Sequence, residues 1–105
     1  MQARGWGRLV NIASISGVRA GTGRLSYGTS KAALIAMTKQ FAIESAEFGV
    51  TVNAIAPGPV LTPLVQKLHV GDTVETYSNM VPMRRYGTTD EIAHAVAFLC
   101  SEGAS

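Results

Sequence analysis

Two short apolar segments, residues 8–14 and 50–56, flank a longer segment, residues 27–48, and this order constrains the fold most. In both short segments apolar residues occupy alternate and adjacent positions alike, which is typical of strands in a parallel sheet covered on both faces. The longer segment has helical periodicity and ends at Gly49. The order strand, helix, strand predicts an α/β fold in which a right-handed helical crossover joins two parallel strands.

Tyr27 and Lys31 lie four residues apart at the start of the predicted helix. That spacing places them on one face, about 6 Å apart along the helix axis. A phenol alone is a weak base at neutral pH, but a nearby ammonium group stabilises its phenolate form. Such a pair can exchange a proton with an alcohol or a carbonyl oxygen. Pairs with this spacing also occur on solvated helix faces, so the neighbouring motifs must decide between the two interpretations.

A serine and a proline-rich loop follow the two predicted strands. Ser14 ends the first strand, and Pro57-Gly58-Pro59 follows the second. Because ligands of open α/β sheets bind outside the carboxyl ends of the strands, we expect Ser14, Tyr27 and this loop at one edge. The Ser14 hydroxyl can donate a hydrogen bond to a substrate oxygen, or it can cap a turn. Ser16 lies closer to Tyr27 in sequence and is expected to be a loop hydroxyl.

These motifs together resemble the short-chain dehydrogenase/reductase family, nearest to its 3-oxoacyl-carrier-protein reductase-like members and its sugar or polyol dehydrogenases. The resemblance rests on Ser14, Tyr27, Lys31 and the stretch Asn53-Ala54-Ile55-Ala56-Pro57-Gly58-Pro59-Val60-Leu61-Thr62. It implies a Rossmann-type doubly wound parallel sheet and an enzyme that interconverts a secondary alcohol and a ketone by hydride transfer with NAD or NADP. The substrate would be a small molecule.

The resemblance also implies a role for each site residue. Ser14, Tyr27 and Lys31 would be catalytic, with Tyr27 the acid in reduction and the base in oxidation. The residues expected to bind the cofactor are Tyr27, Lys31, Pro57, Gly58, Val60 and Thr62. Lys31 would bind the nicotinamide ribose, and Val60 and Thr62 would hold the carboxamide. The loop could instead serve only as structure.

The glycine-rich turn that binds the cofactor pyrophosphate in this family has no counterpart here. We therefore expect residues 1–105 to be a single partial NAD(P)-binding Rossmann-like domain, which lacks the glycine-rich N-terminal half and the final strand. Such a chain should bind the cofactor weakly and be inactive alone. It could be a non-catalytic structural or oligomerising fragment that retains the family's motifs. An epimerase or dehydratase is a third alternative, which the Pro57–Thr62 loop disfavours.

The C-terminal part is predicted to hold a long loop and a helix. Residues 57–87 contain only short helical segments, 63–69 and 73–81, and the resemblance implies a lid over the substrate. A helix should begin near Thr88-Thr89-Asp90-Glu91, where Thr88 or Thr89 can cap it. We expect its buried side to consist of Ile92, Ala95, Val96 and Leu99.

Composition excludes several classes of function. The net charge of +2 comes from scattered residues, whereas nucleic-acid binding needs a basic face. His69, His94 and Cys100 lack metal-ligand spacing, and no apolar run approaches the ~18 residues of a membrane span. A single cysteine, expected to be buried, suits the cytoplasm. The broad apolar surface of the 27–48 helix predicts a homo-oligomer.

Overall fold

The computed structural model describes all of residues 1–105 and contains a two-stranded parallel sheet. Strand β1 (Gly7–Ile12) lies beside β2 (Val50–Ile55), with Gly7 opposite Val50 and Ile12 opposite Ile55. Helix α1 (Leu25–Ser45) and the 3₁₀ turn η3 (Ala46–Phe48) connect the two strands. The predicted order of strand, helix and parallel strand is thus confirmed.

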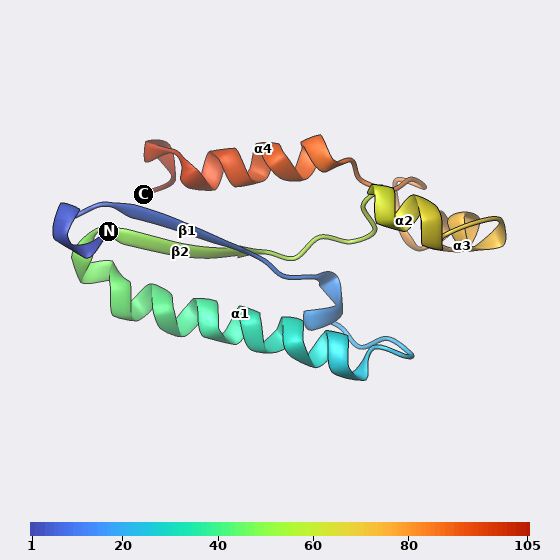
Figure 1. Cartoon of the computed structure of the whole chain (residues 1–105), viewed down its shortest axis with the longest axis horizontal. Coiled ribbons are helices and arrows are strands. Elements are labelled where there is room, and N and C mark those ends of the chain that lie inside the picture. Colours follow the sequence, from blue (N-terminus) through green and yellow to red (C-terminus); the bar gives the residue numbers. More distant parts are fainter.

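Helices cover both faces of the sheet. Helix α1 lies along one face, and α4 (Thr89–Cys100) lies along the other (Figure 1). The short helices α2 (Pro63–Leu68) and α3 (Asp72–Met80) lie beyond the carboxyl ends of the strands (Figure 1). Short 3₁₀ turns complete the chain: η1 (Gln2–Arg4), η2 (Ile15–Gly17) and η4 (Glu102–Ala104). None of these helices has both the length and the apolar character that crossing a bilayer requires.

The element boundaries differ slightly from the predicted ones. Strand β1 ends at Ile12, because Ser14 already caps the turn η2. Hydrogen bonding to β2 nevertheless continues beyond Ile12, since the Ala13 amide donates to the Ile55 carbonyl at 2.7 Å. Helix α1 begins at Leu25, which places Tyr27 in its first turn. Gly49 ends η3 with a left-handed φ of 67°, as the sequence predicts.

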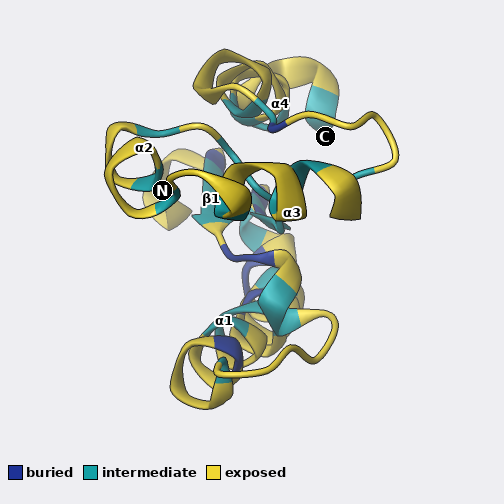
Figure 2. Ribbon diagram, turned by 90° about the vertical axis from the view of Figure 1, so that its right-hand side faces the viewer, coloured by how far each residue is buried: buried dark blue, intermediate teal, exposed yellow.

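The core is small, and this corrects the prediction of two buried strands. Its buried apolar residues are Ala13, Val50, Val52 and Tyr86. Leu9 and Val10 in β1 are only half-buried, and Ile12 is 46% exposed. Figure 2 shows exposed residues over much of every helix. Two strands offer too narrow a surface for the helices to enclose both faces completely.

Helix α4 buries a narrower face than predicted. Ile92, Val96 and Leu99 are half-buried, but Ala95 and Cys100 are exposed. At 100° per residue, Ala95 and Cys100 flank the stripe that the other three form, so they lie beyond the edge of the two-stranded sheet. The prediction that Cys100 is a buried thiol is therefore wrong.

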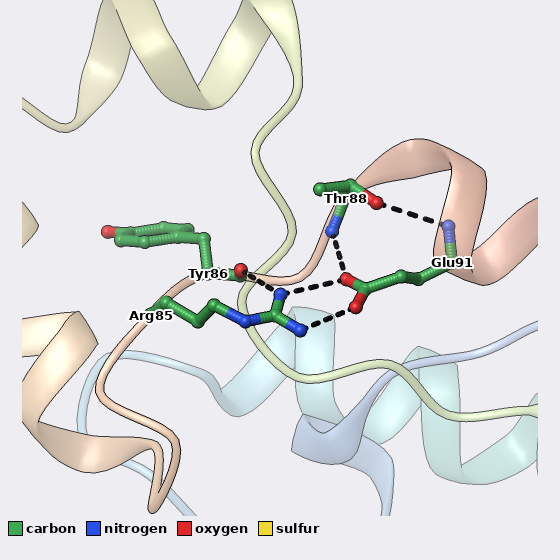
Figure 3. Close-up of polar contacts among 4 residues, drawn as sticks. All are labelled: Arg85, Tyr86, Thr88 and Glu91. Atoms are coloured by element: carbon green, nitrogen blue, oxygen red, sulfur yellow. Dashed lines mark hydrogen bonds and ion pairs between the residues drawn. The ribbon is translucent and has the colours of Figure 1, made fainter.

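A capping box starts α4 (Figure 3). The Thr88 hydroxyl accepts a hydrogen bond from the Glu91 amide at 3.2 Å, and the Glu91 carboxylate accepts one from the Thr88 amide at 2.7 Å. Arg85 forms an ion pair with Glu91 and also donates to the Tyr86 carbonyl at 3.0 Å. The hydrogen bond from Arg85, followed by that from Thr88, lowers the pKa of Glu91 to about 2. The predicted cap at Thr88 is confirmed, and it marks the end of the long 57–87 segment.

Candidate active site

An open cleft of roughly 560 Å³ lies at the carboxyl edge of the sheet. Its walls bring together residues from β1, α1 and the loop after β2, and these include six of the predicted site residues: Ser14, Tyr27, Pro57, Gly58, Val60 and Thr62. The seventh, Lys31, does not line the cleft. The arrangement is that expected for ligands of a parallel α/β sheet.

Lys31 lies beside Tyr27 at the end of the first strand. Its ammonium Nζ donates a hydrogen bond to the Ile12 carbonyl at 2.9 Å and lies 5.8 Å from the centroid of the Tyr27 ring. Tyr27 is 45% exposed and lines the cleft. Lys31 therefore contacts the protein backbone and lies beside the ring of Tyr27.

Ser14 is buried, with 8% of its surface exposed, and its Oγ accepts a hydrogen bond from the Ser16 amide at 3.2 Å. Ser14 therefore caps the turn η2. An accepting hydroxyl still carries its own proton, so Ser14 can also donate to an oxygen in the cleft. Ser16 is part of the same turn and shares the cleft wall.

Two glycines let α1 approach the turn η2. A Cβ atom at Gly28 would lie 2.9 Å from the Ser16 carbonyl oxygen, and one at Gly17 would lie 2.7 Å from the Lys31 carbonyl carbon. Neither position can hold a side chain without moving the backbone. This close packing holds Ser14 and Tyr27 on adjoining elements. The role of either glycine is not evident from the sequence, because it depends on the backbone of another segment.

The loop after β2 offers unpaired polar groups. The Leu61 amide donates to the Gly87 carbonyl at 2.8 Å, and the Gly87 amide donates to the Pro59 carbonyl at 2.9 Å. These two bonds flank Val60. The N–H and C=O groups of Val60 therefore point away from Gly87, and neither group makes a backbone hydrogen bond. Thr62 Oγ1 accepts from the Val65 amide at 3.1 Å and keeps its proton to donate.

Three aromatic residues from the 57–87 segment, which were not predicted as site residues, also line the cleft. The His69 ring stacks on Tyr77 with centroids 4.4 Å apart, and His69 Nδ1 lies 2.9 Å from the Tyr86 hydroxyl. Burial, with a smaller contribution from Tyr77, raises the pKa of Tyr86. His69 is thus a half-buried polar residue with a hydrogen-bond partner. Its partners are 8 and 17 residues away, so no local pattern reveals them.

Arg24 is a further residue that the sequence analysis missed. It directly precedes α1, and its Nη2 group donates to the Tyr77 hydroxyl at 2.9 Å. Its guanidinium carbon lies 5.7 Å from the Tyr27 ring centroid. The signal in the sequence that could have pointed to Arg24 is its position, because it places a positive charge three residues before Tyr27.

Comparison with known proteins agrees with this geometry. The family described as "Enoyl-(Acyl carrier protein) reductase" matches residues 1–105. The 3-oxoacyl-[acyl-carrier-protein] reductase FabG of Aquifex aeolicus (strain VF5) is 43% identical over 100 residues, which are 95% of this chain and 40% of that protein. The chain thus spans about two-fifths of the length of this relative.

Solved structures show the same fold. "ElxO with NADP Bound" has a TM-score of 0.89 at 37% identity, over 97% of this chain and 42% of that one. The NAD⁺-bound xylitol dehydrogenase has a TM-score of 0.88 at 34% identity, over 99% and 46%. The sheet is thus part of a Rossmann-type doubly wound fold. Since the family match extends over every residue, the chain belongs to the short-chain dehydrogenase/reductase family.

Proposed function

We propose that this chain carries the catalytic residues of an NAD(P)-dependent oxidoreductase that interconverts a secondary alcohol and a ketone. One observation carries the proposal: a single cleft is lined by Ser14, Tyr27 and the loop with Val60 and Thr62, while the Lys31 ammonium lies 5.8 Å from the Tyr27 ring. A proton donor, a hydrogen-bond donor and a candidate carboxamide site therefore share one space.

Ser14 and Tyr27 supply the acid–base chemistry. When bound, NAD(P)H supplies the hydride that a carbonyl carbon accepts. Ser14 donates a hydrogen bond to the carbonyl oxygen, where negative charge develops. Tyr27 then gives its phenolic proton to that oxygen, and in the oxidation it takes the proton back. Lys31, held by the Ile12 carbonyl, stays beside the phenol through both directions.

The loop after β2 fits the nicotinamide end of the cofactor. A carboxamide needs both a hydrogen-bond donor and an acceptor, and Val60 offers a free N–H and C=O while Thr62 offers a hydroxyl proton. Gly58 leaves open space where a side chain would stand. No residues here match the family's pyrophosphate-binding turn, so we expect the 105-residue chain alone to bind the cofactor weakly and to lack turnover.

A second role, assembly through α1, is favoured by the surface of that helix. Met37, Phe41 and Ile43 are 53%, 44% and 76% exposed. Met37 and Phe41, four residues apart, lie on one face of the helix, and Ile43 lies on another. Exposed apolar surface of this kind is typical of contact sites. A homo-oligomer through α1 is compatible with the enzymatic role.

A chimera tests the proposed reaction. Residues 1–105 would replace the matching segment of the Aquifex aeolicus reductase, whose remaining part supplies the rest of the fold. We expect the chimera to reduce ketones with NADPH or NADH. Lys31→Ala should lower both turnover and nucleotide affinity, whereas Lys39→Ala, on the exposed surface of α1, should change neither. A folded chimera that binds nucleotide but reduces no ketone would refute the proposal.

A further inference from the structure

Arg24 has hydrogen-bonding capacity that the protein leaves unused. The residue is half-buried, and its guanidinium group makes one hydrogen bond, from Nη2 to the Tyr77 hydroxyl, and forms no ion pair. A guanidinium group carries five N–H donors in a planar fork. Four donors of Arg24 therefore remain available.

The cleft around Arg24 contains no carboxylate. Arg24 lines the 560 Å³ cleft together with Ser14 and Tyr27, and no Asp or Glu belongs to that wall. An adjoining hollow of roughly 380 Å³ shares Arg24 and adds Arg19, again without an acidic residue. The ion pair between Arg85 and Glu91 is the only one in the chain. A cleft lined by charge of one sign attracts ligands of the opposite sign.

Arg24 is also close to the reacting group of the proposed function. Its guanidinium carbon lies 5.7 Å from the centroid of the Tyr27 ring. An anion bound by Arg24 would thus lie beside the phenol that exchanges the proton. Tyr77, whose oxygen accepts the bond from Arg24, keeps its own proton and can donate it to the same anion.

We propose that Arg24, assisted by Tyr77, binds a carboxylate or phosphate group of the substrate. This inference rests on the proposed function and narrows it: the substrates are hydroxy acids, oxo acids or phosphate esters whose anionic group is few bonds from the reacting carbon. A planar guanidinium fork matches either oxyanion, and hydrogen bonds between charged partners are the strong ones. Arg19 adds a second positive charge in the adjoining hollow.

Binding to the 105-residue chain tests the inference without turnover. NMR titrations would follow the Arg24 side-chain N–H signal with three alcohols: 3-hydroxybutyrate, glycerol 3-phosphate and the neutral methyl 3-hydroxybutyrate. We expect at least one anion to bind roughly tenfold or more tightly than the ester, because one charge-assisted bond is worth that much. The stronger of the two anions identifies the chemical class. Equal binding of all three alcohols, or no binding, would overturn the inference.

Two variants distinguish recognition of the anion by Arg24 from a general effect of the protein's positive charge. Arg24→Met should remove the preference for the anion, while Lys39→Met, which deletes the same charge on an exposed part of α1, should keep it. If Arg24→Met keeps the preference, Arg24 is only a support for the lid and the inference fails. Anion binding without ketone reduction in the chimera would therefore count against the proposed function alone, and the reverse result would count against this inference alone.

Discussion

At the scale of the residue, the same side chains position the backbone and face the cleft. Ser14 Oγ accepts from the Ser16 amide, and Thr62 Oγ1 accepts from the Val65 amide. Each bond uses a lone pair and leaves the hydroxyl proton free. The structural and functional interpretations of these residues are therefore compatible, because capping fixes the direction in which the proton can be donated.

Ser14→Ala in the chimera tests this double role. We expect kcat to fall by roughly 10²–10³-fold, the usual effect of deleting one hydrogen-bond donor to developing negative charge. Nucleotide affinity should stay near its starting value. The matched control is Ser16→Ala, because that serine lines the same cleft but its hydroxyl makes no hydrogen bond. Equal losses in the two variants would contradict a specific role of the Ser14 hydroxyl.

At the scale of the element, the ends of helices are set by local chemistry. The box of Thr88 and Glu91 starts α4, and Gly49 ends the segment before β2. The pKa of Glu91 falls from 4.5 to about 2 because its carboxylate accepts bonds from Arg85 and Thr88. A lowered pKa means that the charged form stabilises the fold above pH 4.5 and that this contribution is lost as pH falls toward 2.

Glu91→Gln should remove that pH dependence. Wild-type protein is expected to lose resistance to urea between about pH 4.5 and 2. The variant should be less stable than wild type above this range and should converge with it at the acidic end, because its neutral amide does not titrate. Urea midpoints measured across this range would show the effect, with Glu75→Gln as the control, since Glu75 makes no ion pair. Parallel curves for Glu91→Gln and wild type would contradict the assignment.

The sequence predicted the elements well because their signals are local. Periodicity identified β1, α1 and β2, and a threonine followed by an acidic residue identified the start of α4. The contacts of the 57–87 segment were not predictable in this way. Arg24 and Tyr77 are 53 residues apart, and their contact depends on how α3 folds back over the cleft.

Burial was also hard to predict from the pattern alone. Ala95 and Cys100 are apolar enough for a core, but two strands do not reach them. The role of Gly17 and Gly28 was also hidden from the sequence pattern. Each glycine matters because another segment of backbone packs closely against it. Pattern identifies which face is apolar, whereas burial depends on how wide the opposing surface is.

At the scale of the whole molecule, the chain exposes more surface than its mass warrants. Its accessible surface is 7225 Å² at 11.0 kDa, whereas a folded monomer of that mass exposes about 5,600 Å². The radius of gyration is 16.0 Å, against about 13 Å for a compact chain of this length. At about 25 cal/mol per Å², covering a few hundred Å² of apolar surface stabilises an assembly by several kcal/mol.

We therefore predict that the 105-residue chain associates with copies of itself through α1. Light scattering at micromolar concentration should give a mass above that of one chain. Phe41→Glu, on α1, should shift the mass toward the monomer, while Phe98→Glu, on an exposed part of α4, should not. A monomeric wild type would refute the association. If only Phe98→Glu shifted the mass, the contact would lie on α4 and not on α1.

The central claim is that Tyr27 is the acid–base group, and Tyr27→Phe in the chimera tests it most directly. The substitution removes only the ionisable oxygen, so ketone reduction should fall by about 10²–10⁴-fold while the nucleotide dissociation constant stays near its starting value. Both quantities would be measured on the same preparation. A variant that binds nucleotide normally and retains more than about a tenth of the turnover would contradict the account.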